Sequence, residues 1–185
     1  MGRLLLSAIV ALAGGPAFAG ELTWHFYKDD PNAGALAVVD SDEIESPEPH
    51  YPFLLSCSAD QEWSMYVSDI DHKELGETIA RGDQPTFAIA ATTAGKEEKS
   101  GEFFPEIAFG QMEGVWEYSS IWDLGLLDHL AGADSIAIRG TGISVALPVK
   151  EMKASIAAFK DFCGAVGAGD GEGPDASPDD GSDTP

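Results

Sequence analysis

The densest group of metal-capable side chains lies in one short stretch and comprises Asp69, Asp71, His72 and Glu74. Calcium and similar hard cations take several oxygen ligands, so a loop that holds these acids could bind calcium loosely. The alternative is a solvated acidic turn, which a chain with 32 acidic residues produces easily by chance. The stretch is therefore a weak candidate metal site, and the sequence predicts no cofactor.

The other polar side chains lack the spacing of a zinc or catalytic site. Zinc sites use closely paired ligands, whereas three histidines stand isolated in the sequence: His25, His50 and His129. The pair Ser119-Ser120 and the single Ser144 lack the glycine-flanked turn of a hydrolase nucleophile. Two carboxylates acting on a glycosidic bond stay possible, because they need only meet in space. The sequence therefore names no catalytic residue.

The first 19 residues have the three zones of a secretory signal peptide. Arg3 supplies the positive start, Leu4 to Leu12 the apolar stretch, and Ala17-Phe18-Ala19 the small-x-small cleavage site. Two glycines and a proline at 14–16 interrupt the apolar run, whereas a membrane span needs about 20 apolar residues. We therefore predict a signal peptide over 1–19, no transmembrane segment, and a bacterial periplasmic or secreted product. An uncleaved anchor is the alternative.

Export bears on the only two cysteines, Cys57 and Cys163. Oxidising compartments favour disulfides, and bonded thiols cannot act as nucleophiles. The sequence predicts one disulfide between Cys57 and Cys163 that ties the middle of the chain to its end. Two free buried thiols are the alternative.

The chain is strongly acidic, with 10 basic residues against its 32 acids and a net charge of −22. Such a surface repels nucleic-acid phosphates and anionic lipid head groups, because both are bound by Lys and Arg. Nucleic acid is therefore disfavoured as a partner. We interpret the acidity first as a source of solubility and second as an attraction for a cationic partner.

The last residues differ in composition from the rest. Residues 165–185 hold six acids with many glycines and prolines, and they contain no basic or aromatic residue. Such a segment cannot bury enough apolar surface to offset its ordering entropy. We predict a disordered acidic tail over 165–185 and a single globular β-rich domain over 20–164, a typical size for one domain.

Strand patterns dominate that domain. Leu22, Trp24 and Phe26 alternate with Thr23 and His25, the period of a half-buried strand. Similar signals predict strands at 35–39, 53–57, 63–67, 86–91, 103–109, 115–119, 135–139 and 143–147. Pro105 favours a sheet edge for its segment, and the glycines of Gly140-Thr141-Gly142 favour a tight hairpin with positive φ. The tryptophans at 63, 116 and 122 are interpreted as core residues.

Two helices are predicted. The first spans Trp122 to Leu130, with Asp123 near its start and Gly132 past its end, and places His129 on a helix face. The second follows Pro148, where four residues at helical spacing form one apolar face: Met152, Ile156, Phe159 and Cys163. Gly164 is expected to end this helix in a left-handed cap. The expected fold is mainly β, a β-sandwich or barrel of about 8 strands, with a short internal helix and a C-terminal helix docked by the disulfide.

These features together resemble small bacterial envelope proteins. The signal peptide, an early Trp-containing strand, Leu55-Ser56-Cys57, Trp116-Glu117-Tyr118-Ser119 and a closing helix ending in Cys163 are similar to the invasion-associated locus B family. They also resemble an accessory envelope family encoded with type VI secretion systems. The resemblance covers Leu22 to Cys163 and implies a periplasmic β-sandwich-like domain with one intradomain disulfide and no known enzymatic site.

We therefore predict an exported, non-enzymatic binding or envelope-accessory protein, with another envelope protein or a small ligand as its partner. The alternative function is a small secreted hydrolase acting on cell-wall or glycan material.

Overall fold

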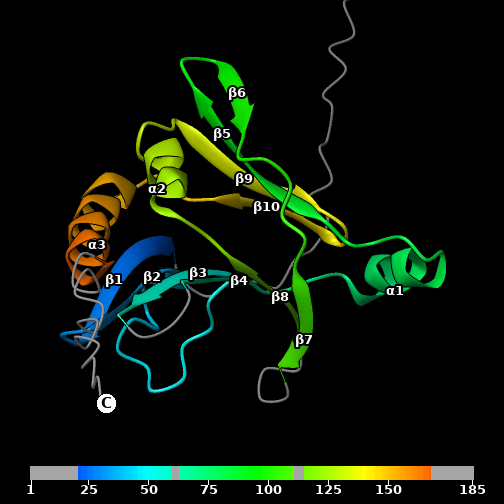
Figure 1. The fold of residues 1–185 in the computed structure, drawn as a ribbon, viewed down its shortest axis with the longest axis horizontal. Helices are drawn as coiled ribbons and strands as arrows, with labels where there is room; N and C mark the ends of the chain where they lie inside the picture. The colour runs from blue at the N-terminus through cyan, green and yellow to red at the C-terminus, as the bar shows by residue number, and fades with distance from the viewer. Residues whose placement is uncertain (1–20, 60–62, 111–114, 168–185) are drawn as a thin grey trace, which may run out of the picture.

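The computed structural model describes residues 21–59, 63–110 and 115–167, so the predicted signal peptide and residues 168–185 of the predicted tail lie outside the described residues. Within these described ranges, ten strands form two antiparallel sheets (Figure 1). The larger sheet has the order β1 (Leu22–Asp30), β2 (Ala33–Asp40), β3 (Phe53–Ser58), β4 (Ser64–Val67), β8 (Val115–Ile121) and β7 (Glu106–Gly110). The smaller sheet has the order β10 (Ile143–Leu147), β9 (Ser135–Gly140), β5 (Phe87–Thr93) and β6 (Lys96–Lys99). The mainly β fold predicted from the alternating pattern is confirmed.

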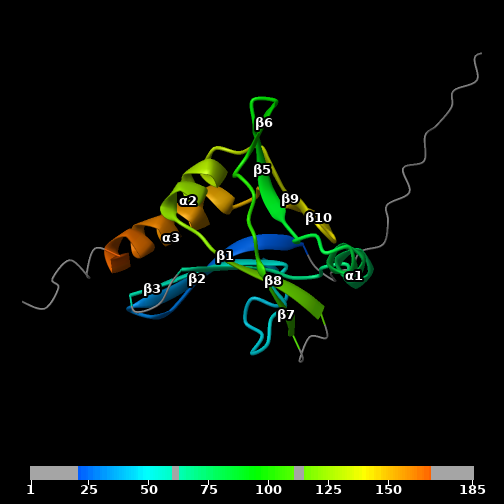
Figure 2. The same ribbon diagram turned by 45° about the vertical axis from the view of Figure 1, so that its right-hand side comes forward.

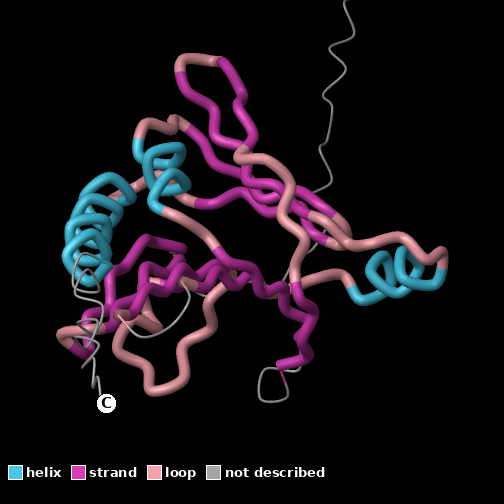
Figure 3. Tube along the Cα trace, viewed as in Figure 1, coloured by secondary structure: helices cyan, strands magenta, loops and turns pink. Residues whose placement is uncertain are grey.

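The described ranges also contain three helices, α1 (His72–Ala80), α2 (Leu124–Ala131) and α3 (Met152–Gly167). Figure 3 shows α2 and α3 together at one end of the molecule and α1 alone at the other. Helix α3 packs against α2 and against β1, β2 and β3. In Figure 2 the smaller sheet rises steeply from the larger one, and α2 and α3 fill the space on one side between them.

The core lies between the sheets, where alternate residues of β3, β4 and β9 are buried. In β3 the residues Phe53, Leu55 and Cys57 point inward, as the predicted strand requires. Tyr118 of β8 links the sheets, because its ring stacks on Phe87 at 5.7 Å and its hydroxyl donates to the Thr141 carbonyl at 2.7 Å. Burial disfavours the phenolate and raises the pKa of Tyr118 to about 12.

The disulfide joins Cys57 of β3 to Cys163 of α3, as predicted. Both cysteines are buried, and the apolar face of α3 lies in the core alongside them. Helix α3 continues to Gly167, so the predicted left-handed cap at Gly164 is wrong. Gly164 is exposed and lies within the helix. A Cβ added at this position would meet no atom within 4 Å.

Two elements of the fold escaped prediction. Helix α1 has Leu75 as its buried apolar residue, so it lacks the repeating stripe by which a longer helix is recognised. Strand β6 consists of exposed charged residues, and it forms because it pairs with β5 across the turn Ala94-Gly95. Both turn residues have positive φ, the conformation of a two-residue hairpin loop.

Three local predictions need correction. The segment 103–109 forms a strand from Glu106 only, at the sheet edge that Pro105 favoured, while Phe103 bridges to Phe87. Trp116 is 37% exposed and packs on Phe109 at a sheet edge instead of in the core. Gly142 has the expected positive φ, whereas the φ of Gly140 is not positive. Glycine is needed at 140 because the backbone of Thr86 lies too close to leave room for a Cβ.

Candidate functional site: the outer face of the six-stranded sheet

The six-stranded sheet has one side turned away from the four-stranded sheet, which we name the outer face. In β4, Met65 and Val67 are buried in the core, so Ser64 and Tyr66 point to the outer face. In β8 the buried Tyr118 likewise alternates with outer-face residues. The loop 41–52 crosses this side of the sheet and is seen below it in Figures 1 and 2.

Strand registers align the outer-face residues in two rows across the sheet. The first row contains His25, Ala37, Leu54, Tyr66, Ser119 and Glu106. The second contains Tyr27, Ala35, Ser56, Ser64 and Ile121. Small residues therefore separate a few large ones, and two of the large ones stand well into solvent, with Tyr66 41% and Ile121 64% exposed.

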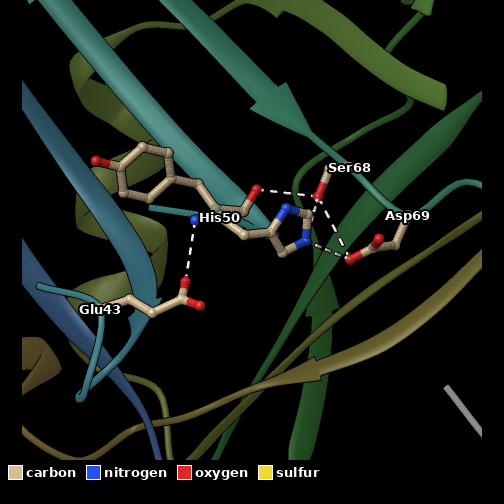
Figure 4. A network of polar contacts seen from close by, with 5 residues as sticks. Glu43, His50, Ser68 and Asp69 are labelled. Atoms are coloured by element: carbon tan, nitrogen blue, oxygen red, sulfur yellow. Dashed lines mark hydrogen bonds and ion pairs between the residues drawn. The ribbon is translucent and has the colours of Figure 1, made fainter. Parts of the chain in front are cut away.

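A polar network attaches the loop 41–52 to this face (Figure 4). His50 Nε2 lies 2.9 Å from Asp69 Oδ2, and the backbone N–H of His50 donates to Glu43 Oε2 at 3.1 Å. Ser68, which is 5% exposed, donates its hydroxyl to the Tyr51 carbonyl at 3.0 Å. The Glu43 bond joins the two ends of the loop, and the bonds to Asp69 and Ser68 hold its last residues beside the end of β4.

The combination of Ser68, His50 and Asp69 is not a catalytic triad. A triad needs the serine and the carboxylate on opposite nitrogens of the imidazole ring. Here the Ser68 hydroxyl, at 3.5 Å, and the Asp69 carboxylate both approach Nε2 of His50. The short bond of Ser68 goes instead to the Tyr51 carbonyl, so this serine is held as a structural donor. The network therefore positions the loop.

The loop and the sheet form an open pocket of about 210 Å³ on the outer face. Its lining includes Tyr51, Leu54, Tyr66 and Glu117, with His50 on the loop side. The walls are thus mainly aromatic and aliphatic, and the lining contains neither Lys nor Arg. The sequence did not indicate this pocket, because its walls come from β3, β4, β8 and a loop.

Charge is distributed unevenly over the fold. No Lys or Arg occurs between Lys28 and Lys73, or between Lys99 and Arg139. These two intervals supply β2, β3, β4, β7, β8 and the loop 41–52. Within the six-stranded sheet the one base is Lys28, which lies over the Phe162 ring of α3 at 5.2 Å. The two outer-face rows therefore carry one acid, Glu106, and no Lys or Arg.

Several bases elsewhere form local ion pairs. The pairs are Arg81–Asp83, Arg139–Glu97, Lys150–Glu21 and Lys160–Asp128. The Glu21 carboxylate raises the pKa of Lys150 by accepting its hydrogen bond and by its charge. These exposed pairs contribute little to stability, but they show that positive charge gathers away from the outer face.

The four weak metal candidates separate into different structural roles. Asp69 contacts His50, whereas Asp71 caps α1 by accepting from the backbone N–H groups of Lys73 and Glu74 at 2.8 and 3.3 Å. His72 and Glu74 lie exposed in the first turn of α1. Within the part of the chain that is described, no three His, Cys, Asp or Glu side chains are arranged to hold a metal. The spacing of Asp71 and Glu74 is that of a helix capping box, a signal that could have predicted α1.

We expect Asp71→Ala to lower the melting temperature more than Asp71→Asn, because asparagine also caps a helix and alanine does not. Thermal unfolding followed by circular dichroism, with and without calcium, measures this. A calcium-dependent rise in melting temperature that both variants abolish would instead indicate a metal site.

The same cap has a pH signature. The two backbone N–H donors lower the pKa of Asp71 below its ordinary value of 3.8. The contribution of the Asp71 carboxylate to the free energy of unfolding is therefore complete above pH 3.8. It is lost as the pH falls through the lowered pKa of Asp71 in the folded state. We expect the stability difference between the wild type and Asp71→Asn to shrink in that acidic range, as acid titrations of both proteins would show.

A second, larger hollow of about 460 Å³ lies where α2 begins. Trp122 forms part of its wall and is held by hydrogen bonds from Nε1 to the carbonyls of Ser56 and Ser64 at 3.0 and 3.1 Å. His129 also lines the hollow from α2, the helix-face position predicted for it. Among the described residues, its buried Nε2 has no hydrogen-bond partner. Lys99 and Asp123 place both signs of charge here, so this hollow does not select one charge.

Comparison with protein-family models, curated proteins and solved structures finds no match to this chain. Within the described ranges, none of the helices is long and apolar enough to span a membrane.

Proposed function

We propose that this protein is an exported, non-enzymatic binding protein of the bacterial envelope, and that its outer face engages a positively charged partner protein. The observation that carries the proposal is the outer face itself, where aromatic and aliphatic side chains lie beside Glu106 and Glu117 and the rows contain no Lys or Arg. Complementary charge raises association rates and selects partners.

The geometry of the His50 network supports a binding role over catalysis. Among the described side chains, this cluster comes nearest to a catalytic set in its residue types. However, the Asp69 carboxylate and the Ser68 hydroxyl both approach Nε2 of His50, whereas a triad needs them on opposite ring nitrogens. The alternative, a small hydrolase, has no arrangement of described side chains in its favour. Export rests on the predicted signal peptide and is supported by the Cys57–Cys163 disulfide, since such bonds persist in oxidising compartments.

A charge-reversal experiment tests this function. The probe is a fluorescein-labelled, capped peptide of alternating arginine and serine, and its binding to the disulfide-bonded protein is followed by fluorescence anisotropy. Ser119→Lys places a positive charge in the first outer-face row, directly beside Tyr66. We expect it to weaken peptide binding about tenfold, because like charges repel across a partly desolvated contact.

The matched control is Ser135→Lys, which adds the same charge to an exposed position of β9 in the other sheet. We expect this variant to bind almost like the wild type, and we expect Ile121→Lys on the outer face to reproduce the loss. Binding of the wild type should also weaken as salt is added, because the charges are near solvent. Equal losses in Ser119→Lys and Ser135→Lys would show that only net charge matters and would contradict the proposal.

A further inference from the structure

We propose that the outer-face pocket receives one arginine side chain from an extended segment of the partner, with the guanidinium held over the ring of Tyr66. This inference rests on the proposed function and names the group that the outer face recognises. It follows from the size of the pocket, the nature of its walls, the charge around it and the way its position is held.

Size indicates a single side chain. Pockets for drug-sized ligands have volumes of about 300–1,000 Å³, whereas this one measures about 210 Å³. A larger partner must therefore lie across the sheet and insert one group. The neighbours of Tyr66 suit such a segment, since Ser64 lies two residues away on the same strand and Ser119 lies directly opposite. Their small side chains leave the Tyr66 ring uncrowded.

The walls favour a flat cation. Tyr66 is exposed enough to present a ring face, and Leu54 lies opposite it in the register of β3 and β4. An aromatic face attracts a cation through its quadrupole, and arginine does this with its planar guanidinium. Leu54 and Pro49 can contact the aliphatic stem of the same side chain.

Charge distinguishes a cation from an apolar side chain of similar size. Glu117 lines the pocket from β8, and Asp69 and Glu43 lie in the network beside it. With no Lys or Arg in the lining, the local field favours a positive guest. A neutral guest of the same shape would meet the same walls without this attraction.

The network in Figure 4 holds the pocket in its shape before a partner arrives. His50 is bound to Asp69 at the ring and to Glu43 at the backbone, and Tyr51 is bound to Ser68 through its carbonyl. A wall that is already ordered loses less entropy on binding. The His50 network is therefore a positioning device for the pocket.

The test uses the arginine–serine peptide and a second peptide in which citrulline replaces every arginine. Citrulline keeps the shape of arginine and removes its charge. We expect Tyr66→Ala to weaken binding of the arginine peptide about fivefold and Tyr66→Phe to change it less than about twofold, since the ring supplies the attraction. The citrulline peptide should bind far more weakly and should not distinguish the wild type from Tyr66→Ala.

Ile79→Ala is the matched control, because it removes a more exposed side chain, 52% exposed, from α1, away from the outer face and outside the pocket. Its binding should stay within about twofold of the wild type, and circular dichroism should show all three variants folded. If Ser119→Lys weakens binding while Tyr66→Ala does not, the outer face binds the partner and the pocket inference is wrong. If neither variant changes binding, the proposed function itself fails. Equal binding of the citrulline peptide would overturn the role of charge in the pocket.

Discussion

Replacing both cysteines, by Cys57→Ser with Cys163→Ser, is expected to lower the free energy of unfolding by about 2–5 kcal/mol. The disulfide links residues 106 positions apart, so it removes many extended conformations from the unfolded chain. It also fastens α3 to β3 at the helix's buried face. The measurement is urea unfolding followed by tryptophan fluorescence.

The double variant is the suitable test, because a single replacement leaves one reactive thiol. Wild-type protein reduced in denaturant should unfold at about the same urea concentration as the double variant. We expect α3 to stay docked in the folded variant, since Met152, Ile156 and Phe159 remain in the core. An unchanged urea midpoint, or two titratable thiols in the oxidised wild type, would contradict the prediction.

Gly140→Ala is expected to lower the free energy of unfolding by about 3 kcal/mol or more, at the upper end of overpacking effects. A Cβ at this position would lie 2.2 Å from the Thr86 carbonyl oxygen and 2.5 Å from the Phe87 Cα. Both are backbone atoms of the segment that pairs with β9, so they cannot move without breaking that register. The variant should unfold at lower urea concentration and lower temperature.

Gly164→Ala is the control for this substitution and is expected to have the opposite sign. A Cβ on Gly164 meets no atom within 4 Å, and the residue lies inside α3. Alanine should stabilise that helix by about 0.5–1 kcal/mol, because it loses less backbone entropy. If both variants were equally stable, the close approach of β9 to the Thr86 backbone would be disproved.

Local patterns predicted most of the elements. Alternating burial in β3 and β4 was readable because each strand has one face in the core and one face outside it. Helix α2 was readable from Asp123, whose side chain accepts from the Gly125 N–H at 2.8 Å as a helix cap. The Cys57–Cys163 bond followed from a buried strand end and an apolar helix face.

Elements that depend on distant partners were not predicted. Strand β6 has no apolar face and exists through pairing with β5, with the Ala94 N–H held by the Asp134 carboxylate at 2.8 Å. Trp116 reads as a core residue in the sequence, yet its ring is 37% exposed and packs on Phe109 of the edge strand β7. Burial of a strand residue is thus a property of what lies opposite it.

The sequence by itself determined that the chain is strongly acidic, that two long intervals lack bases, and that alternating strands would sort side chains to two faces. Only the tertiary structure decided that these intervals share one surface. Pairing of β4 with β8 brings residues 64–67 beside 118–121 and joins the two base-free intervals in one sheet. Because that pairing is made by backbone hydrogen bonds between segments far apart in the chain, no local pattern of charges could reveal the outer face or its pocket.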